Sequence, residues 1–289
     1  MMTLDPNLAA NFVKEAAPGF SPRVGIVLGS GLGPLADKVE VVASIEYEDI
    51  PDFPKSTVEG HEGRLILGRL GGMPIACLQG RVHYYEGVNP QDLAVPVRML
   101  KLLGVDILLL TNAAGSFRKK MGPGSLMLIS DHINFTGLNP LVGENDDTFG
   151  PRFFSMENAY DPTLRKHFKA VAKELDITLH EGIYLHYLGP NFETPAEIKA
   201  FKALGPDAVG MSTTPEVLVA RHAGLRVAAI SNITNLAAGM SKTELSHEQT
   251  LESAKLAAED LETLIIVFLE TLKRELLKAH LRSTENGDN

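Results

Sequence analysis

The sequence predicts an α/β fold with a central mixed, largely parallel β-sheet surrounded by helices. Three runs, GIVLG, DILLLTN and VAAIS, are apolar without interruption, which is typical of strands buried on both faces of a sheet. Helical patterns separate many of the strand-like runs, as they do in parallel sheets. The chain has 289 residues, of which 44% are hydrophobic and 22% are charged, so it has enough apolar surface for a sizeable core.

The first part of the chain contains four predicted strands. A helix with its lead-in is expected within residues 1–20. Apolar runs then predict strands over residues 23–30, 64–70, 73–79 and 106–112. Apolar residues recur at helical spacing after Pro90 and predict a helix over residues 90–103.

The second part repeats the alternation of strands and helices. Strands are predicted over residues 125–133, 182–188, 208–212 and 226–235, and helices over residues 162–175, 194–203 and 215–222. One long helix is expected over residues 247–281, with Ser246 as its N-cap. Its apolar stretch LETLIIVFLETL is too short to span a bilayer, so we expect it to cover the core. Residues 282–289 are expected to fray, and without a linker or repeat we treat residues 1–289 as a single domain.

Charge and cysteine content limit the possible partners and the compartment. Lys and Arg total 27 against 36 Asp and Glu, a net charge of −9, which argues against a nucleic-acid-binding surface. No apolar run is long enough to span a membrane, and the first residues lack the basic and apolar segments of a secretion signal. The one cysteine, Cys77, lies in an apolar run. These features predict a cytoplasmic protein without nucleic-acid or membrane partners, and the histidine spacing predicts no metal site.

Glycines follow the first predicted strand, in VGIVLGSGLGPLAD. They would let the backbone approach an anion closely, and Ser30 adds a hydroxyl donor. A dinucleotide-binding loop would need a glycine where Pro34 stands, and a nucleophile elbow would need one where Leu28 stands. No lysine follows the glycines, which excludes a P-loop.

A second strand end, GRVHYYEG, places three polar side chains on one face of an extended chain. These are Arg81, His83 and Tyr85, at alternate positions, and His61 occurs in the separate segment GHEGRL. A guanidinium group beside imidazole rings is typical of an anion site. In the third such segment, TNAAGS, small residues would let backbone N–H groups meet a ligand.

The segments GPNFETPAE and VGMSTTPE place a different set of groups at loop starts. Phe192, Glu193, Met211 and Ser212 supply an aromatic ring, a carboxylate, a thioether and a hydroxyl. This combination suits a flat heterocycle carrying a sugar better than it suits a bare anion.

Eight segments together resemble one known family over residues 20–270. LGSGLG, GHEGRL, GRVHYYEG, TNAAGS, DHINFTGLNPL, GPNFETPAE, VGMSTTPEV and SNITN match the trimeric purine nucleoside phosphorylases in order and spacing. The resemblance implies a phosphorylase-type fold, a homotrimer, and cleavage of 6-oxopurine nucleosides by inorganic phosphate to base and ribose 1-phosphate in purine salvage. It implies no metal or organic cofactor, because phosphate is a co-substrate.

The same resemblance implies a role for each matching residue. The implied phosphate site comprises Ser30, His61, Arg81, His83, Ala113 through its backbone, and Ser212. The implied nucleoside site comprises Tyr85 and Met211 at the ribose, His247 at the 5′-hydroxyl, Phe192 against the base, Glu193 and Asn235 reading the 6-oxopurine, and Tyr184 lining the base pocket. The implied catalytic residues are His83, Glu193 and Asn235.

Alternatives remain at this point. Methylthioadenosine phosphorylases resemble a version with aspartate where this chain has Asn235. A hydrolase would need acidic catalysts, and the pair Asp146 and Asp147 lies in a stretch with the composition of a loop. A nucleoside-binding protein without turnover is the non-enzyme alternative.

The base specificity within the family is also open. Inosine and guanosine, with their deoxyribose forms, are the leading candidate substrates. Tyr187 and the loop NDDTFGPRFFSMENAYD resemble the bacterial branch that accepts xanthosine. The phenol of Tyr187 would either bond the 2-oxo group of xanthosine or simply pack in the core.

Overall fold

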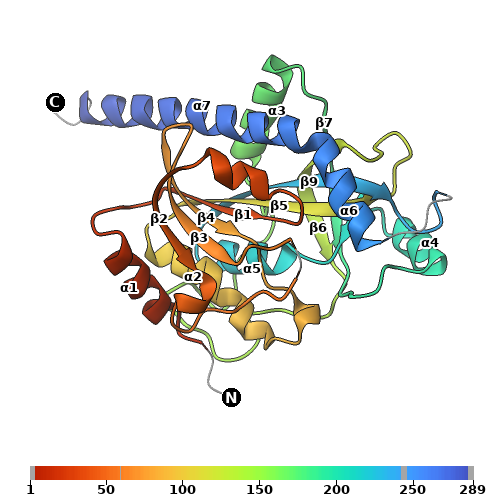
Figure 1. Ribbon diagram of the computed structural model, residues 1–289, viewed down its shortest axis with the longest axis horizontal. Coiled ribbons are helices and arrows are strands. Elements are labelled where there is room, and N and C mark those ends of the chain that lie inside the picture. Colours follow the sequence, from red (N-terminus) through yellow and green to blue (C-terminus); the bar gives the residue numbers. More distant parts are fainter. Residues whose placement is uncertain (1–3, 59, 242–245, 286–289) are drawn as a thin grey trace.

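The computed structural model describes residues 4–58, 60–241 and 246–285. Within these residues, nine strands form one sheet with helices on both sides (Figure 1). The strands are β1 Val24–Leu28, β2 Glu40–Glu46, β3 Arg64–Leu70, β4 Met73–Gln79, β5 Ile107–Ser116, β6 Ser125–Asn134, β7 Leu179–His186, β8 Ala208–Gly210 and β9 Arg226–Leu236. The α/β class expected from the sequence is confirmed.

The sheet is mixed, and it closes on itself at one end. Its order is β2-β3-β4-β1-β5-β8-β7-β6-β9, and β5 also pairs with β9. The pairs β1–β4, β1–β5, β5–β9, β6–β7 and β7–β8 are parallel, while β2–β3, β3–β4, β5–β8 and β6–β9 are antiparallel. Because β5 contacts both β8 and β9, strands β5 to β9 form a closed ring, and β1 to β4 extend from it as an open sheet.

Helices cover the sheet from two sides. They are α1 Pro6–Ala16, α2 Val95–Leu102, α3 Pro162–Glu174, α4 Pro195–Ala203, α5 Thr214–His222, α6 His247–Ala254 and α7 Ala258–Glu285. In Figure 1, α7 and α3 lie on one side of the strands, and α1, α2 and α5 lie on the other. Of the helices described, none combines the length and apolar character that crossing a membrane requires.

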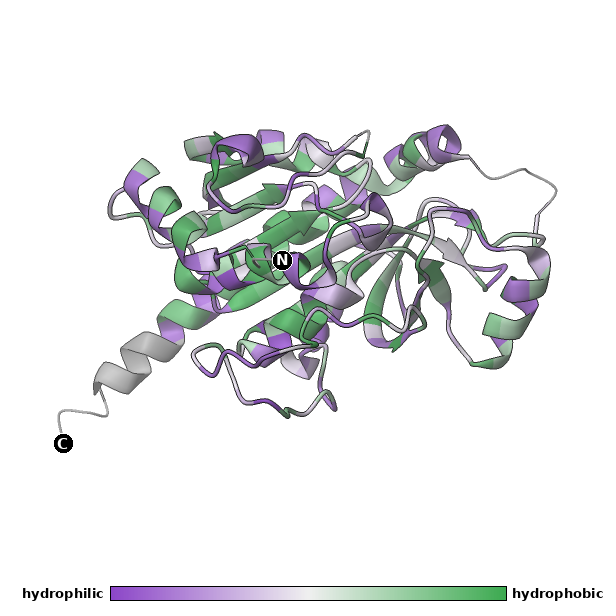
Figure 2. Cartoon of the chain, turned by 90° about the horizontal axis from the view of Figure 1, so that it is seen from below, coloured by the Kyte–Doolittle hydropathy of each residue, from purple (hydrophilic) through white to green (hydrophobic). Residues whose placement is uncertain are grey.

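The side chains of β1 alternate between two cores. Ile26 and Leu28 belong to the core beneath α3 and α7, whereas Val27 belongs to the core beneath α1, α2 and α5. Figure 2 shows the strands mostly green, while the helices alternate between green and purple. Between α3 and α7, the rings of Phe168 and Phe268 stack 3.7 Å apart. A strand with both faces covered needs a continuous apolar run, which is why GIVLG lacks polar residues.

Two elements differ from the sequence prediction. Strand β2 was not predicted: it is an edge strand in which only Ile45 is buried, and its other apolar residues, such as Val41 and Val42, are exposed. The expected helix over residues 247–281 is divided by a 3₁₀ turn, Lys255–Ala257. The carbonyl oxygen of Ala254 accepts a hydrogen bond from Asn232 Nδ2 at 2.7 Å, and the tighter turn follows at this point.

Several boundaries also differ. The predicted N-cap is confirmed, since Ser246 Oγ accepts from Gln249 N. Helix α7 continues to Glu285, beyond the predicted helix end at residue 281, and residues 286–289 of the tail expected to fray lie outside the described residues. The helix expected over residues 90–103 begins as a 3₁₀ turn, Pro90–Ala94, before α2. Strand β7 begins and ends earlier than predicted.

Candidate functional site

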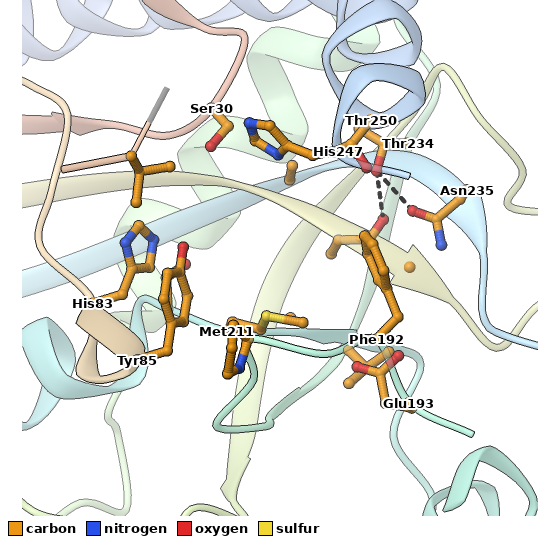
Figure 3. Close-up of a pocket in the computed structure, with 18 of the residues that line it drawn as sticks. Ser30, His83, Tyr85, Phe192, Glu193, Met211, Thr234, Asn235, His247 and Thr250 are labelled. Carbon is orange, nitrogen blue, oxygen red and sulfur yellow. Dashed lines mark hydrogen bonds between the residues drawn. The ribbon is translucent and has the colours of Figure 1, made fainter. Parts of the chain in front are cut away.

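A cavity of about 310 Å³ lies where the carboxyl ends of β1, β4, β5 and β9 meet the connection from β8 to α5. Figure 3 shows side chains from these elements and from α6 pointing into it. Among the predicted site residues, its lining includes Ser30, Arg81, His83, Tyr85, Ala113, Phe192, Glu193, Met211, Ser212, Asn235 and His247. Residues far apart in the sequence are therefore brought into one pocket, as expected at the carboxyl ends of parallel strands.

Gly29 sets how closely β1 approaches β5 at one end of the pocket. A Cβ atom at this position would lie 2.8 Å from Asn112 Cα and 2.8 Å from the carbonyl oxygen of Thr111. The N–H of Gly29 donates to Thr111 Oγ1 at 3.1 Å. Only glycine permits this contact without displacing a strand, and the residues that follow the contact on the two strands, Ser30 and Ala113, both line the pocket.

Arg81 is a nearly buried cation at the same end, with the residue 6% exposed. Its Nε donates to Glu216 Oε1 and its Nη1 donates to the carbonyl oxygen of Thr111, both at 2.6 Å. Its Nη2 is buried and has no partner among the described residues. A buried donor without a partner costs stability, so this nitrogen is suited to meet an anionic ligand.

His61 does not line the pocket but supports it from behind. Its Nε2 lies 3.2 Å from Ser30 Oγ, and its Nδ1 lies 2.8 Å from the carbonyl oxygen of Arg81. Burial, together with the neighbouring His83 and Arg81, lowers the pKa of His61 to about 4. The ring is therefore neutral at neutral pH and orients Ser30 rather than supplying a charge.

His83 is held by a carboxylate three residues further on. Its Nδ1 lies 2.9 Å from Glu86 Oε1, and its ring stacks on Tyr85 with centroids 4.6 Å apart. Burial lowers the pKa of His83, although Glu86 partly offsets this. Burial also opposes ionisation of Glu86, but hydrogen bonds from His83 and Thr57 outweigh it and lower the pKa of Glu86 to about 2. The Glu86 carboxylate therefore stays charged and fixes the imidazole.

The opposite end of the pocket carries groups suited to a heterocycle. Phe192, 38% exposed, lies between Glu193 and the amide of Asn235 in Figure 3. Burial raises the pKa of Glu193, and nearby Glu197 raises it further. Asn235 Oδ1 accepts from Thr234 Oγ1 at 2.9 Å, which fixes the orientation of the amide. A carboxylate and a fixed amide beside an aromatic ring form a hydrogen-bonding site for a flat ring.

Two predicted base-site residues lie outside this lining. Tyr184 was expected to line the base pocket, but it is fully buried behind it, and its hydroxyl accepts from Ser212 N at 3.2 Å. That expectation is wrong as to position, because Gly210 leaves room for the phenol beneath the floor of the pocket. Tyr187 packs against Phe201, and its hydroxyl accepts from Asn191 Nδ2 at 3.0 Å.

The sequence analysis missed several residues of the site. Thr234 and Thr250 line the pocket, Glu86 contacts His83, and Thr111 and Glu216 hold Arg81. The sequence could have indicated Glu86, because it lies only three residues after His83. The other contacts join segments that are far apart in the sequence. In the described part of the chain, no cluster of three or more His, Cys, Asp or Glu side chains is arranged to hold a metal ion.

Comparison with known proteins identifies the family. The sequence model of the phosphorylase superfamily matches residues 23–270. Purine nucleoside phosphorylase 1 of Bacillus subtilis is 50% identical over 84% of this chain and 90% of its own length, and that of Geobacillus stearothermophilus is 48% identical over 93% and 97%.

A solved structure agrees with these sequence matches. Isoform 2 of purine nucleoside phosphorylase from Schistosoma mansoni, in complex with cytosine and ribose-1-phosphate, superposes with a TM-score of 0.87. It is 43% identical and covers 92% of this chain and 95% of that chain. With the fold, the pocket and the relatives in agreement, the chain belongs to the purine nucleoside phosphorylases of the phosphorylase superfamily.

Proposed function

We propose that the protein cleaves 6-oxopurine ribonucleosides and deoxyribonucleosides with inorganic phosphate, giving the free base and ribose or deoxyribose 1-phosphate for purine salvage. One observation carries the proposal: the pocket is lined at one end by Arg81, whose buried Nη2 has no partner among the described residues, and at the other by Glu193 and Asn235. An anion at the first end and a purine at the second would leave the sugar between them. Inosine and guanosine are the proposed substrates.

The proposed chemistry uses phosphate as the nucleophile and needs no metal or organic cofactor. Bond cleavage leaves positive charge on the sugar and negative charge on the departing base. Arg81, Ser30 and Ser212 would position the phosphate anion. Because the Nδ1 proton of His83 is directed at the Glu86 carboxylate, its Nε2 would accept a hydrogen bond from the protonated oxygen of phosphate. Because phosphate is already an anion, the paired carboxylates that glycosidases use are not required.

Asn235 and Glu193 would act at the base. The Asn235 amide, fixed by Thr234, would bond the imidazole nitrogen and the carbonyl oxygen of the purine as negative charge develops there. Glu193 would accept from the ring N–H beside that carbonyl. A 6-aminopurine has no such N–H, which argues against methylthioadenosine as the substrate.

Cleavage of inosine is expected to depend strictly on phosphate. Because no described carboxylate pair activates water in the pocket, the rate without phosphate should fall to background. The test follows hypoxanthine release with and without phosphate, and arsenate serves as a replacement anion. Equal rates in the presence and absence of phosphate would identify a hydrolase instead.

Xanthosine is proposed as a further substrate. Asn191 Nδ2 donates both to the hydroxyl of Tyr187 and to the carbonyl oxygen of Phe192, which links Tyr187 to the base end of the pocket. Tyr187→Val should therefore lower kcat/KM for xanthosine about 5-fold relative to inosine, since one hydrogen bond contributes about 1 kcal/mol. Tyr187→Phe keeps the ring and removes only the hydroxyl, so it should lower the ratio similarly, and an unchanged ratio in both variants would discard the idea.

The remaining proposals concern the assembly and the compartment. A homotrimer is supported by the similarity to the family and by Phe153, which is 89% exposed in the isolated chain. Its measured mass in solution tests this. The net charge of −9 and the single buried Cys77 support one cytoplasmic domain that binds neither nucleic acid nor membranes.

A further inference from the structure

Glu216 reaches Arg81 from a distant part of the chain. Arg81 follows β4, and Glu216 lies in the first turn of α5. Their side chains are 5% and 11% exposed, and Arg81 Nε donates to Glu216 Oε1 at 2.6 Å. A charge-assisted hydrogen bond this short, and this far from solvent, restricts the plane of the guanidinium group.

The contacts of Arg81 divide its three nitrogens between protein and ligand. Glu216 holds Nε and the carbonyl oxygen of Thr111 holds Nη1, whereas the buried Nη2 has no partner within the described residues. Two fixed nitrogens determine the direction of the third, because the guanidinium is planar. Because Arg81 lines the pocket, the direction of its Nη2 relative to a bound anion therefore depends on Glu216.

A second, mostly apolar cavity borders the Arg81–Glu216 ion pair. It is smaller than the first, and its lining includes Val27, Leu78, Leu93 and Val97. Removing the Glu216 side chain would enlarge this cavity. The guanidinium group would then have room to turn away from the pocket, and apolar side chains would not hold it in its present plane.

We propose that Glu216 is a positioning residue for the anion: it acts through Arg81 and directs the Nη2 of that guanidinium at phosphate. This inference rests on the proposed function, because it concerns the anion end of the same pocket. Glu216 has two opposing effects on a bound anion. It fixes the guanidinium, which favours binding, and it places a negative charge nearby, which opposes binding. The proposal states that the geometric effect is the larger one.

Two substitutions separate these effects. Glu216→Ala removes both the charge and the hydrogen-bond acceptor, and it is expected to raise the KM for phosphate about 10- to 100-fold, as loss of an orienting partner typically does. Glu216→Gln keeps an acceptor oxygen at the same reach and removes the charge. Its KM for phosphate should stay within about 3-fold of wild type, and both variants should keep the KM for inosine within about 2-fold.

The control and a second readout distinguish positioning from general destabilisation. Asp161→Asn is the control. Asp161 forms an ion pair at 2.8 Å with Arg226, the first residue of β9, and neither residue lines the pocket. This variant should leave the KM values for phosphate and inosine unchanged. The dissociation constants for inorganic phosphate, measured by calorimetry, should rank the variants in the same order as their KM values for phosphate. If Glu216→Ala does not fold, Glu216→Asp keeps the charge, shortens the reach, and should also weaken phosphate binding.

Three results would overturn the proposal: an unchanged phosphate KM in Glu216→Ala, equal losses in the alanine and glutamine variants, or tighter phosphate binding in both. Failure of the proposed function looks different. In that case the wild-type protein would cleave inosine without phosphate, and calorimetry of phosphate binding would still measure the effect of Glu216 on Arg81.

Discussion

Asn235→Ala is expected to lower the kcat for inosine by about 10²- to 10³-fold, the usual effect of losing one preorganised donor at a developing charge. Asn235 lies near the end of β9, with its Oδ1 accepting from Thr234 and its Nδ2 donating to the carbonyl oxygen of Leu236. These bonds orient the amide before the substrate arrives. Alanine removes a group that bonds the purine more strongly as charge develops, so turnover should fall more than binding.

The measurement compares kcat for inosine with the KM for phosphate in the same variant. Phosphate binding should change little, because Asn235 lies at the end of the pocket opposite to Arg81. Asn134→Ala is the control: this exposed asparagine on β6 bonds the carbonyl oxygen of Leu138, outside the pocket lining, and its loss should not alter turnover. Comparable losses in kcat and in phosphate affinity would contradict the role given to Asn235.

The strands that build the pocket were predictable because they are buried on both faces. The first halves of β1, β5 and β9 lie between two helical layers, so their sequences begin with continuous apolar runs, and polar residues enter β5 and β9 only further along. The polar residues that follow such runs mark the edge where a ligand binds. Ser30 and Arg81 could therefore be placed at this edge from the residues alone, whereas Asn235 was assigned through the family resemblance.

Contacts between distant segments could not be predicted in the same way. Glu216 and Thr111 hold Arg81 from α5 and β5, and nothing in the local sequence around either residue indicates an arginine partner. Likewise, the 3₁₀ turn between α6 and α7 contains no proline or glycine, and it coincides with the Asn232 contact to Ala254. Such features depend on the assembled fold rather than on periodicity.

Tyr184 shows why an aromatic residue near a ligand-binding segment was misplaced. Its position on β7 beside β8 brings it close to the pocket in the sheet register. The register does not say whether the ring lies in the pocket or beneath its floor. Gly210 decides this, because the missing side chain leaves the space that the phenol of Tyr184 occupies.

Glu193→Gln is expected to lower kcat/KM for inosine by about 10- to 100-fold at neutral pH, because hydrogen bonds to a charged group contribute about 1.5–3 kcal/mol. Glutamine keeps an acceptor oxygen but loses the charge, and its amide N–H would favour a base without the ring N–H. The ratio of adenosine to inosine cleavage should therefore rise in the variant. An unchanged ratio would show that Glu193 does not read the base.

The pH dependence gives an independent test of the same group. Burial raises the pKa of Glu193, so its carboxylate takes up a proton at a higher pH than an exposed glutamate does. Once protonated, it no longer accepts well from the purine N–H, and inosine binding should weaken as the pH falls through this raised pKa. Inosine binding is measured by calorimetry in the absence of phosphate, so that the ionisation of phosphate does not contribute to the pH dependence.

Titration of His61 does not interfere with this test, because its pKa of about 4 places its protonation at more acidic pH. The acidic loss of inosine binding should disappear in Glu193→Gln, since glutamine does not titrate. If the variant keeps the same pH profile as the wild type, another group controls inosine binding, and the carboxylate is not what recognises the 6-oxopurine.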